Sequence, residues 1–111
     1  MSEFITPLAD IGDKMSKLSM EIGMKAFMNR DEVGAAAVPY LRVAGHLVFA
    51  YFFARMAKIA LDKEGSGDDF YKAKLAVARF YFARLLPETA TLIRQARSGS
   101  ANLMAMDEHL F

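Results

Sequence analysis

The chain has 111 residues, 14 Lys and Arg against 13 Asp and Glu, and no cysteine. This length predicts a single domain with its own core, and the near balance of charge argues against a nucleic-acid partner. The missing cysteines exclude disulfides, thiol catalysis and thiolate metal sites, and suit a cytoplasmic compartment. Ala, Leu and Met number 37 and Val and Ile only 10, a bias that favours helices over strands.

The first expected helix covers residues 6–28, although a start at Ser2 is also compatible because proline is tolerated in a first turn. Met20, Met24 and Phe27 widen its apolar face, which predicts contacts with two neighbouring helices. The face itself recurs at alternating steps of four and three, as expected for one side of a helix, and consists of Phe4, Leu8, Ile11, Met15, Leu18 and Ile22.

The second expected helix covers residues 31–63 and is bent at Pro39. Asp31 and Glu32 are acids that suit a helix N-terminus. Proline removes a backbone donor and collides with the carbonyl four residues earlier, so we expect the first two turns to be separate or irregular. Residues 47–54 are apolar on every side, which predicts a central helix that is buried on most sides.

A short glycine-containing turn at residues 65–67 predicts the start of a third helix over residues 68–97. Pro87 should kink this helix near Leu86, and Phe80 and Tyr81 should face away from its main apolar stripe. That stripe consists of Phe70, Leu75, Ala78, Phe82, Leu85 and Leu86. The last segment, residues 101–111, can form at most a short helix.

These elements predict an all-α fold in one domain, residues 1–111. Three long helices and a short C-terminal one, joined by short loops, pack as an antiparallel bundle. The longest wholly apolar stretch, Leu47–Ala54, has eight residues, whereas a membrane span needs about 20. We therefore expect no membrane span.

Few residues indicate catalytic or metal chemistry. His46 lies beside an apolar stretch, where a lone histidine is more often a packed, hydrogen-bonded residue than a ligand or base, although a haem-like cofactor on His46 or a Met stays open. Glu108 and His109 are adjacent, so they cannot supply the Glu-x-x-His pair of a di-iron bundle. The serines have no histidine at an evident spacing to activate them. Four arginines by default form solvated faces, and could otherwise bind a phosphate or pair with acids on a neighbouring chain: Arg42, Arg55, Arg79 and Arg84.

The aromatic side chains are more numerous than one three-helix core needs. Those of the second and third helices cannot all face the same groove, so some must point outward. Exposed apolar patches mark interfaces, and aromatic and Met enrichment is typical of interface cores. The candidate interface residues are Phe49, Tyr51, Phe52, Phe53, Phe80 and Tyr81.

Several short motifs, taken in order and spacing, carry a resemblance to a known family. They are Gly34-Ala35-Ala36-Ala37 with Tyr40-Leu41-Arg42 and Gly45, Phe70-Tyr71 with Ala73-Lys74-Leu75-Ala76, Ala78-Arg79-Phe80-Tyr81, Leu86-Pro87-Glu88, and Gly99 followed by Met104-Ala105-Met106-Asp107. From about residue 31 onward the chain resembles the extra C-terminal domain of acyl-CoA dehydrogenases of the 3-methylmercaptopropionyl-CoA dehydrogenase type.

The resemblance implies a parent flavoprotein of fatty acid metabolism that uses FAD to remove hydrogens from the α and β carbons of an acyl-CoA, with a glutamate base outside this chain. Glu64 and Glu88 lie in no matching active-site motif, so no catalytic or cofactor-binding residue is assigned. The chain is then a fragment of a larger enzyme, an inert module that packs against the catalytic body or a neighbouring subunit. Alone, it is expected to form a homodimer.

Two alternatives belong to other classes. A freestanding bundle could hold an apolar ligand such as an acyl chain between its aromatic helices, and a large internal cavity would favour this reading. Binding to a membrane surface through Lys72, Lys74 and Arg79 is less favoured, because these residues do not share one face opposite the aromatics.

Overall fold

The computed structural model describes all residues, 1–111, and contains helices and turns without strands. The predicted all-α fold is confirmed. The α-helices are α1 (Ser2–Met28), α2 (Asp31–Asp62), α3 (Asp69–Phe80), α4 (Glu88–Arg97) and α5 (Ala101–Met104), and the shorter turns are η1 (Glu64–Ser66), η2 (Tyr81–Leu85) and η3 (Glu108–Leu110).

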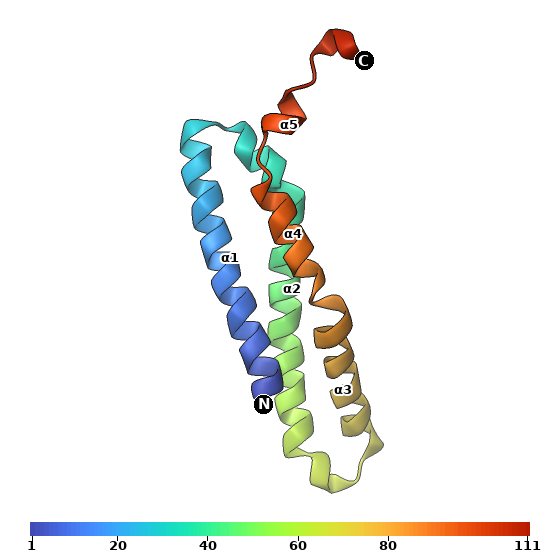
Figure 1. The fold of residues 1–111 in the computed structure, drawn as a ribbon. Coiled ribbons are helices and arrows are strands. Elements are labelled where there is room, and N and C mark those ends of the chain that lie inside the picture. Colours follow the sequence, from blue (N-terminus) through green and yellow to red (C-terminus); the bar gives the residue numbers. More distant parts are fainter.

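The helices form a flat, elongated plate, and the Cα atoms of the whole chain, including the C-terminal segment that projects from one end, span 66 × 29 × 14 Å. α2 runs through its middle, with α1 along one side and α3 along the other (Figure 1). α4 continues the direction of α3 and contacts both α1 and α2. α1, α3 and α4 flank α2 and cover one of its faces. The opposite face runs along the plate without a neighbouring helix.

The core is divided along the length of the plate. At the α4 end, buried side chains come from α1, α2 and α4, with Leu18 and Val43 fully covered. At the α3 end, Phe4 of α1 packs against alanines of α2 and against Leu75 and Ala78 of α3. The predicted α1 face is confirmed, since its six residues are buried or half-buried.

Two proline expectations have different outcomes. Pro39 lies inside one continuous helix, so the expectation of separate or irregular first turns was wrong. Pro87 does interrupt the third helix: the π-helical turn η2 precedes it, and Pro87 is the N-cap of α4. The amide of Leu86 donates to the carbonyl of Tyr81, five residues back, at 2.9 Å.

α1 contacts two helices, α2 and α4, as predicted. The residues expected to widen its face do not make these contacts: Met20, Met24 and Phe27 are exposed, because the flat arrangement places no helix on that side of α1. The expected short C-terminal helix is present as α5, and it projects with the following residues beyond the end of the bundle (Figure 1).

Candidate interaction surface

α2 packs its small side chains inward and presents its large ones to solvent. Five of its six buried residues are alanines, and the sixth is Val43. Small residues at a helix contact allow the axes to approach closely. The outward face carries an exposed apolar row that we call the α2 stripe: Val38, Leu41, Val48, Phe52 and Ile59, each 51–71% exposed.

The spacing of the α2 stripe places it on one side of the helix. Successive members are three, seven, four and seven residues apart, which are near-whole numbers of helical turns. A helix that is apolar on every side is normally buried on every side. α2 is covered on one side only, so the large apolar side chains of the stripe form an exposed apolar surface of the kind found at interfaces.

Open apolar grooves lie on both sides of α2. The α1/α2 groove has a volume of about 500 Å³ and includes Leu41 of the stripe. A groove of about 320 Å³ between α2 and the α3–η2 segment is lined by Phe49, Phe53, Val77, Phe80, Tyr81 and Leu85. A smaller one includes Ile59 of the stripe and Phe70. The stripe and its grooves therefore form one extended apolar surface.

The candidate interface residues divide into exposed and covered members. Phe49, Tyr51, Phe52 and Phe80 are exposed on α2 and α3, and Phe53 is half-buried. Tyr81 lies in the floor of the groove between α2 and the α3–η2 segment and is not an exposed member: only 4% of it is exposed, and its ring stacks on Phe53 with centroids 4.6 Å apart.

The π-helical turn explains why Tyr81 and Leu86 face the same side. α3 is regular up to Phe80, so Tyr81 precedes the wide turn. The five-residue step that follows Tyr81 brings Leu86 to the same side, and both side chains pack in one buried cluster with Ala50. Phe82 becomes half-buried, whereas Phe70 and Leu85 remain exposed, which corrects the expected stripe.

His46 anchors a polar cluster between α2 and the α3–α4 segment. Its Nδ1 lies 2.8 Å from the hydroxyl of Tyr81, and its Nε2 lies 2.9 Å from Oε2 of Glu88. The Tyr81 hydroxyl also donates to the His46 carbonyl at 3.0 Å. The prediction of a packed, hydrogen-bonded histidine is confirmed. Arg42 completes the cluster through an ion pair with Glu88.

The two ring nitrogens of His46 constrain its protonation. When the Tyr81 hydroxyl donates to the backbone carbonyl, Nδ1 must donate to the hydroxyl and Nε2 to Glu88, which requires the charged imidazolium. A neutral ring requires Tyr81 to turn its hydrogen toward Nδ1. The hydrogen bond from His46, followed by the charge of Arg42, lowers the pKa of Glu88, while burial is the main cause that raises the pKa of Tyr81 to about 12.

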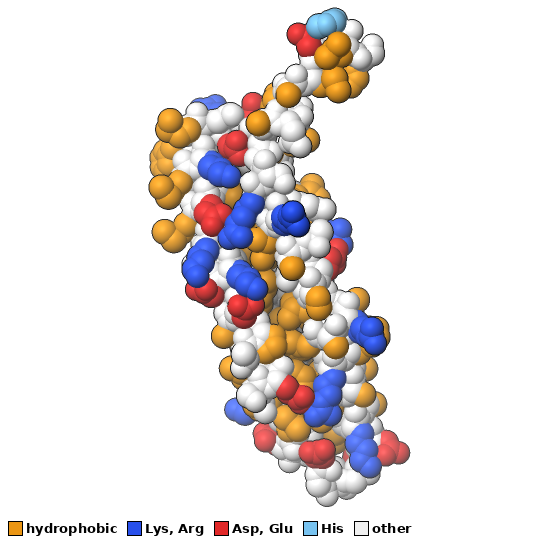
Figure 2. Space-filling model, in the orientation of Figure 1, with side chains coloured by type: hydrophobic (Ala, Val, Ile, Leu, Met, Phe, Trp, Pro, Cys, Tyr) orange, Lys and Arg blue, Asp and Glu red, His pale blue; other side chains and the backbone are white.

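Three further arginines have ordinary structural partners, whereas Arg84 forms no ion pair within the chain. Arg79 forms an ion pair with Glu3, and Arg97 does so with Glu21. Arg55 lies over the ring of Tyr51, 5.7 Å from its centroid. Exposed pairs of this kind contribute about 1 kcal/mol or less. The charged side chains gather on the visible side of α1 and α4, whereas apolar ones line the gap between α1 and α3 (Figure 2).

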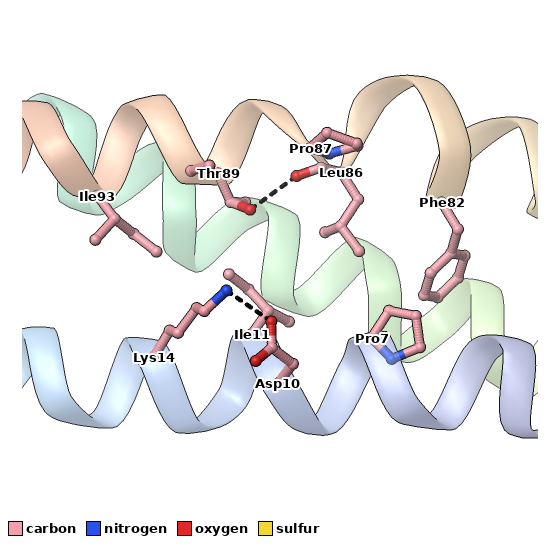
Figure 3. A pocket seen from close by; sticks show the side chains of 10 residues that line it. Pro7, Asp10, Ile11, Lys14, Phe82, Leu86, Pro87, Thr89 and Ile93 are labelled. Carbon is pink, nitrogen blue, oxygen red and sulfur yellow. Dashed lines mark hydrogen bonds and ion pairs between the residues drawn. The ribbon is translucent and has the colours of Figure 1, made fainter.

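A small groove on the α4 side of the plate offers no reactive constellation. It has about 250 Å³ and lies between α1 and the η2–α4 segment, with Ile11, Phe82 and Leu86 among its lining residues (Figure 3). Its polar groups already bind each other: Lys14 pairs with Asp10 at 2.8 Å, and the Thr89 hydroxyl donates to the Leu86 carbonyl at 2.8 Å.

No three His, Cys, Asp or Glu side chains gather in an arrangement that would hold a metal ion. By length and composition alone, α2 passes as a helix able to cross a membrane. The central helix of a soluble protein passes the same test. Arg42 and Arg55 also interrupt its apolar sequence, leaving 12 residues without Lys, Arg, Asp or Glu between them, which is well short of the roughly 20 that a span requires.

Sequence reasoning missed the aliphatic members of the α2 stripe, because it weighed the aromatic residues alone. A signal for them was present. Ala50, Ala54 and Ala57 recur at steps of four and three, which marks the side where another helix approaches closely, and the large residues then face the other way.

Fold and surface together define an all-α bundle whose central helix has one uncovered apolar face. The family model described as "Acetyl-CoA dehydrogenase C-terminal like" matches residues 1–107, and the chain belongs to this family. The chain is also similar to the broad-specificity linear acyl-CoA dehydrogenase FadE5 of Mycobacterium tuberculosis, with 31% identity over 85 residues. The match covers 72% of this chain and 14% of that protein, so the chain spans only a small part of this relative.

Proposed function

We propose that this chain is a non-catalytic interaction and oligomerisation module of an FAD-dependent acyl-CoA dehydrogenase of the 3-methylmercaptopropionyl-CoA dehydrogenase type. Its α2 stripe packs against the remainder of the parent enzyme or a neighbouring subunit, and the isolated chain forms a homodimer in the cytoplasm. The parent reaction is α,β-dehydrogenation of an acyl-CoA.

One observation carries this proposal: α2 buries alanines and exposes Val, Leu, Phe and Ile. Each large apolar side chain moved from solvent into an interface contributes about 1.5–3 kcal/mol. A solitary chain would forgo that stabilisation along the whole stripe. The family match supports a parent enzyme as the covering partner, because the relative extends far beyond the matched segment.

The residues of this chain do not fit FAD. The pyrophosphate of a dinucleotide needs a glycine-rich turn at a helix N-terminus or a set of cationic donors. The α2/α3 grooves are almost wholly apolar. The groove that contains Arg42 also contains Glu88, which binds that arginine. The flavin and the glutamate base are therefore assigned to the rest of the parent enzyme.

The alternative of a bundle that encloses an apolar ligand has less support. The grooves along α2 open to solvent, and the core between the helices is filled by side chains. An acyl chain needs an enclosed cavity that buries most of its surface.

The proposal that the chain is non-catalytic is tested by incubating the purified chain with FAD, a medium-chain acyl-CoA and an artificial electron acceptor. We expect no acceptor reduction above a no-protein control and no change in flavin fluorescence on titration. Saturable flavin quenching, or turnover that is proportional to chain concentration, would contradict a non-catalytic role.

A further inference from the structure

The last eleven residues form an apolar arm that nothing in its own chain covers. Every residue from Ala101 to Phe111 is exposed. The only side-chain interactions of this arm are internal, between Asp107 and His109. Its exposed apolar side chains are Leu103, Met104, Met106, Leu110 and Phe111. We call residues 101–111 the C-terminal arm.

The arm leaves the bundle from a fixed point. Gly99 has a left-handed φ of +79°, and the next residue, Ser100, is buried. The Ser100 hydroxyl and amide donate to Oε1 of Glu32 at 2.9 and 3.3 Å, and Asn29 donates to the hydroxyl at 3.4 Å. The root of the arm is thus held at the N-terminal end of α2.

The α1/α2 groove begins beside this root. Val33, next to Glu32, lines one end of it, and Leu41 lines the other, a span of about 12 Å along the helix. Gly23, Ala36 and Ala37 line the groove with small side chains, and this leaves a groove volume of about 500 Å³. Eleven residues reach about 16 Å as a helix and up to about 36 Å when extended, so an arm is long enough to fill it.

We propose that the C-terminal arm of one copy of this chain occupies the α1/α2 groove of a second copy, in a reciprocal exchange. Because root and groove are neighbours on each copy, a two-fold axis near this end brings each arm to the other copy's groove and closes the assembly. This deepens, and rests on, the proposed role as an oligomerisation module. The arm points past the end of its own bundle (Figure 1) and leaves its own groove open.

Composition suits this occupant. The groove offers an apolar floor, and methionine adapts to such surfaces better than rigid side chains do; the arm carries two methionines.

Disulfide trapping tests the exchange directly, because the chain has no native cysteine. Ala37→Cys places a thiol in the groove and Leu103→Cys places one on the arm. An equimolar mixture of the two single variants should give, on oxidation, a covalent heterodimer near twice 12.3 kDa. A mixture of Leu103→Cys with Lys72→Cys, which lies on α3 at the other end of the plate, should give little of it. Equal trapping in both mixtures would overturn the proposal.

A double variant, Ala37→Cys with Leu103→Cys, distinguishes exchange between two copies from folding of the arm back onto the groove of its own chain. Exchange predicts interchain bonds as the main product at concentrations where the chain is dimeric. Predominant intrachain closure, seen as a faster-migrating monomer, would overturn it.

Deletion of residues 101–111 gives a second, independent measurement. We expect the dissociation constant of the dimer to rise about tenfold or more, with an unchanged melting temperature at low concentration because the arm contacts no part of its own bundle. Filling the groove by Ala37→Trp should weaken the dimer similarly, and mixing this variant with the deletion variant should restore part of the association. A dimer that persists unchanged after the deletion refutes arm exchange but leaves the proposed module intact, whereas a chain that is monomeric at every concentration contradicts both.

Discussion

Phe80 and Tyr81 are adjacent aromatic residues to which the structure gives opposite environments. Phe80 is 58% exposed, whereas Tyr81 is buried and has hydrogen-bond contacts with His46. Truncation of a buried aromatic side chain costs about 3–5 kcal/mol because it removes packing and leaves a cavity. At about 4 °C per kcal/mol for a domain of this size, Tyr81→Ala should lower the melting temperature by roughly 12–20 °C.

Phe80→Ala is the matched control, and it should change the stability by about 1 kcal/mol or less. Tyr81→Phe separates packing from hydrogen bonding: it keeps the ring and removes the hydroxyl, at a cost of about 1–3 kcal/mol from the polar atoms of His46 left without a partner. All three variants are compared by far-ultraviolet circular dichroism during thermal unfolding. If Phe80→Ala destabilises the chain more than Tyr81→Ala, the result contradicts the structure, in which Tyr81 is buried and Phe80 is exposed.

Three further predictions follow from particular contacts. Leu18→Ala should destabilise the fold by about 2–5 kcal/mol, whereas Met24→Ala, an exposed position on the same helix, should change it by less than about 0.5 kcal/mol; chemical denaturation compares them, and equal costs would contradict the burial of α1. Gly67 has a φ of +76° in open space, so Gly67→Ala should cost about 1–2 kcal/mol through backbone conformation alone, and an unchanged denaturation midpoint would count against this turn. The pKa of Glu88 is lowered from its ordinary value of 4.5 by the hydrogen bond from His46. The stability that the Glu88 carboxylate contributes is therefore present above pH 4.5 and is lost as the pH falls through the lowered pKa. The acid-induced loss of stability should be shallower in Glu88→Gln than in the wild type, and identical pH profiles of stability would refute this prediction.

Much of the fold was predictable because periodicity and helix-end signals are local. The face of α1 follows from the spacing of its apolar residues, and the helix ends at Met28, where the expected range ends. Pro39 misled the expectation for α2, since the continuous helix tolerates one missing donor. The register of the third helix could not be predicted, because a π-helical turn depends on how Tyr81 and Leu86 both reach the core, and that is a tertiary effect.

The candidate surface was predictable in kind but not in membership. An aromatic surplus indicated that apolar side chains must face outward, and Phe49, Phe52 and Phe80 do so. The one-sided covering of α2 depends on the flat arrangement of its neighbours, which no local pattern specifies. The same is true of the polar cluster, because His46 and Glu88 are 42 residues apart in sequence.

The central claim is that a partner covers the outward face of α2, and the most direct test is the solution mass of the chain by light scattering across a concentration series. The account predicts a concentration-dependent dimer near twice 12.3 kDa, which Leu41→Glu, on the α2 stripe and in the α1/α2 groove, dissociates and Thr91→Glu, at an exposed position of α4, does not. A folded wild-type monomer up to high micromolar concentration, or equal loss of the dimer in both variants, would contradict it.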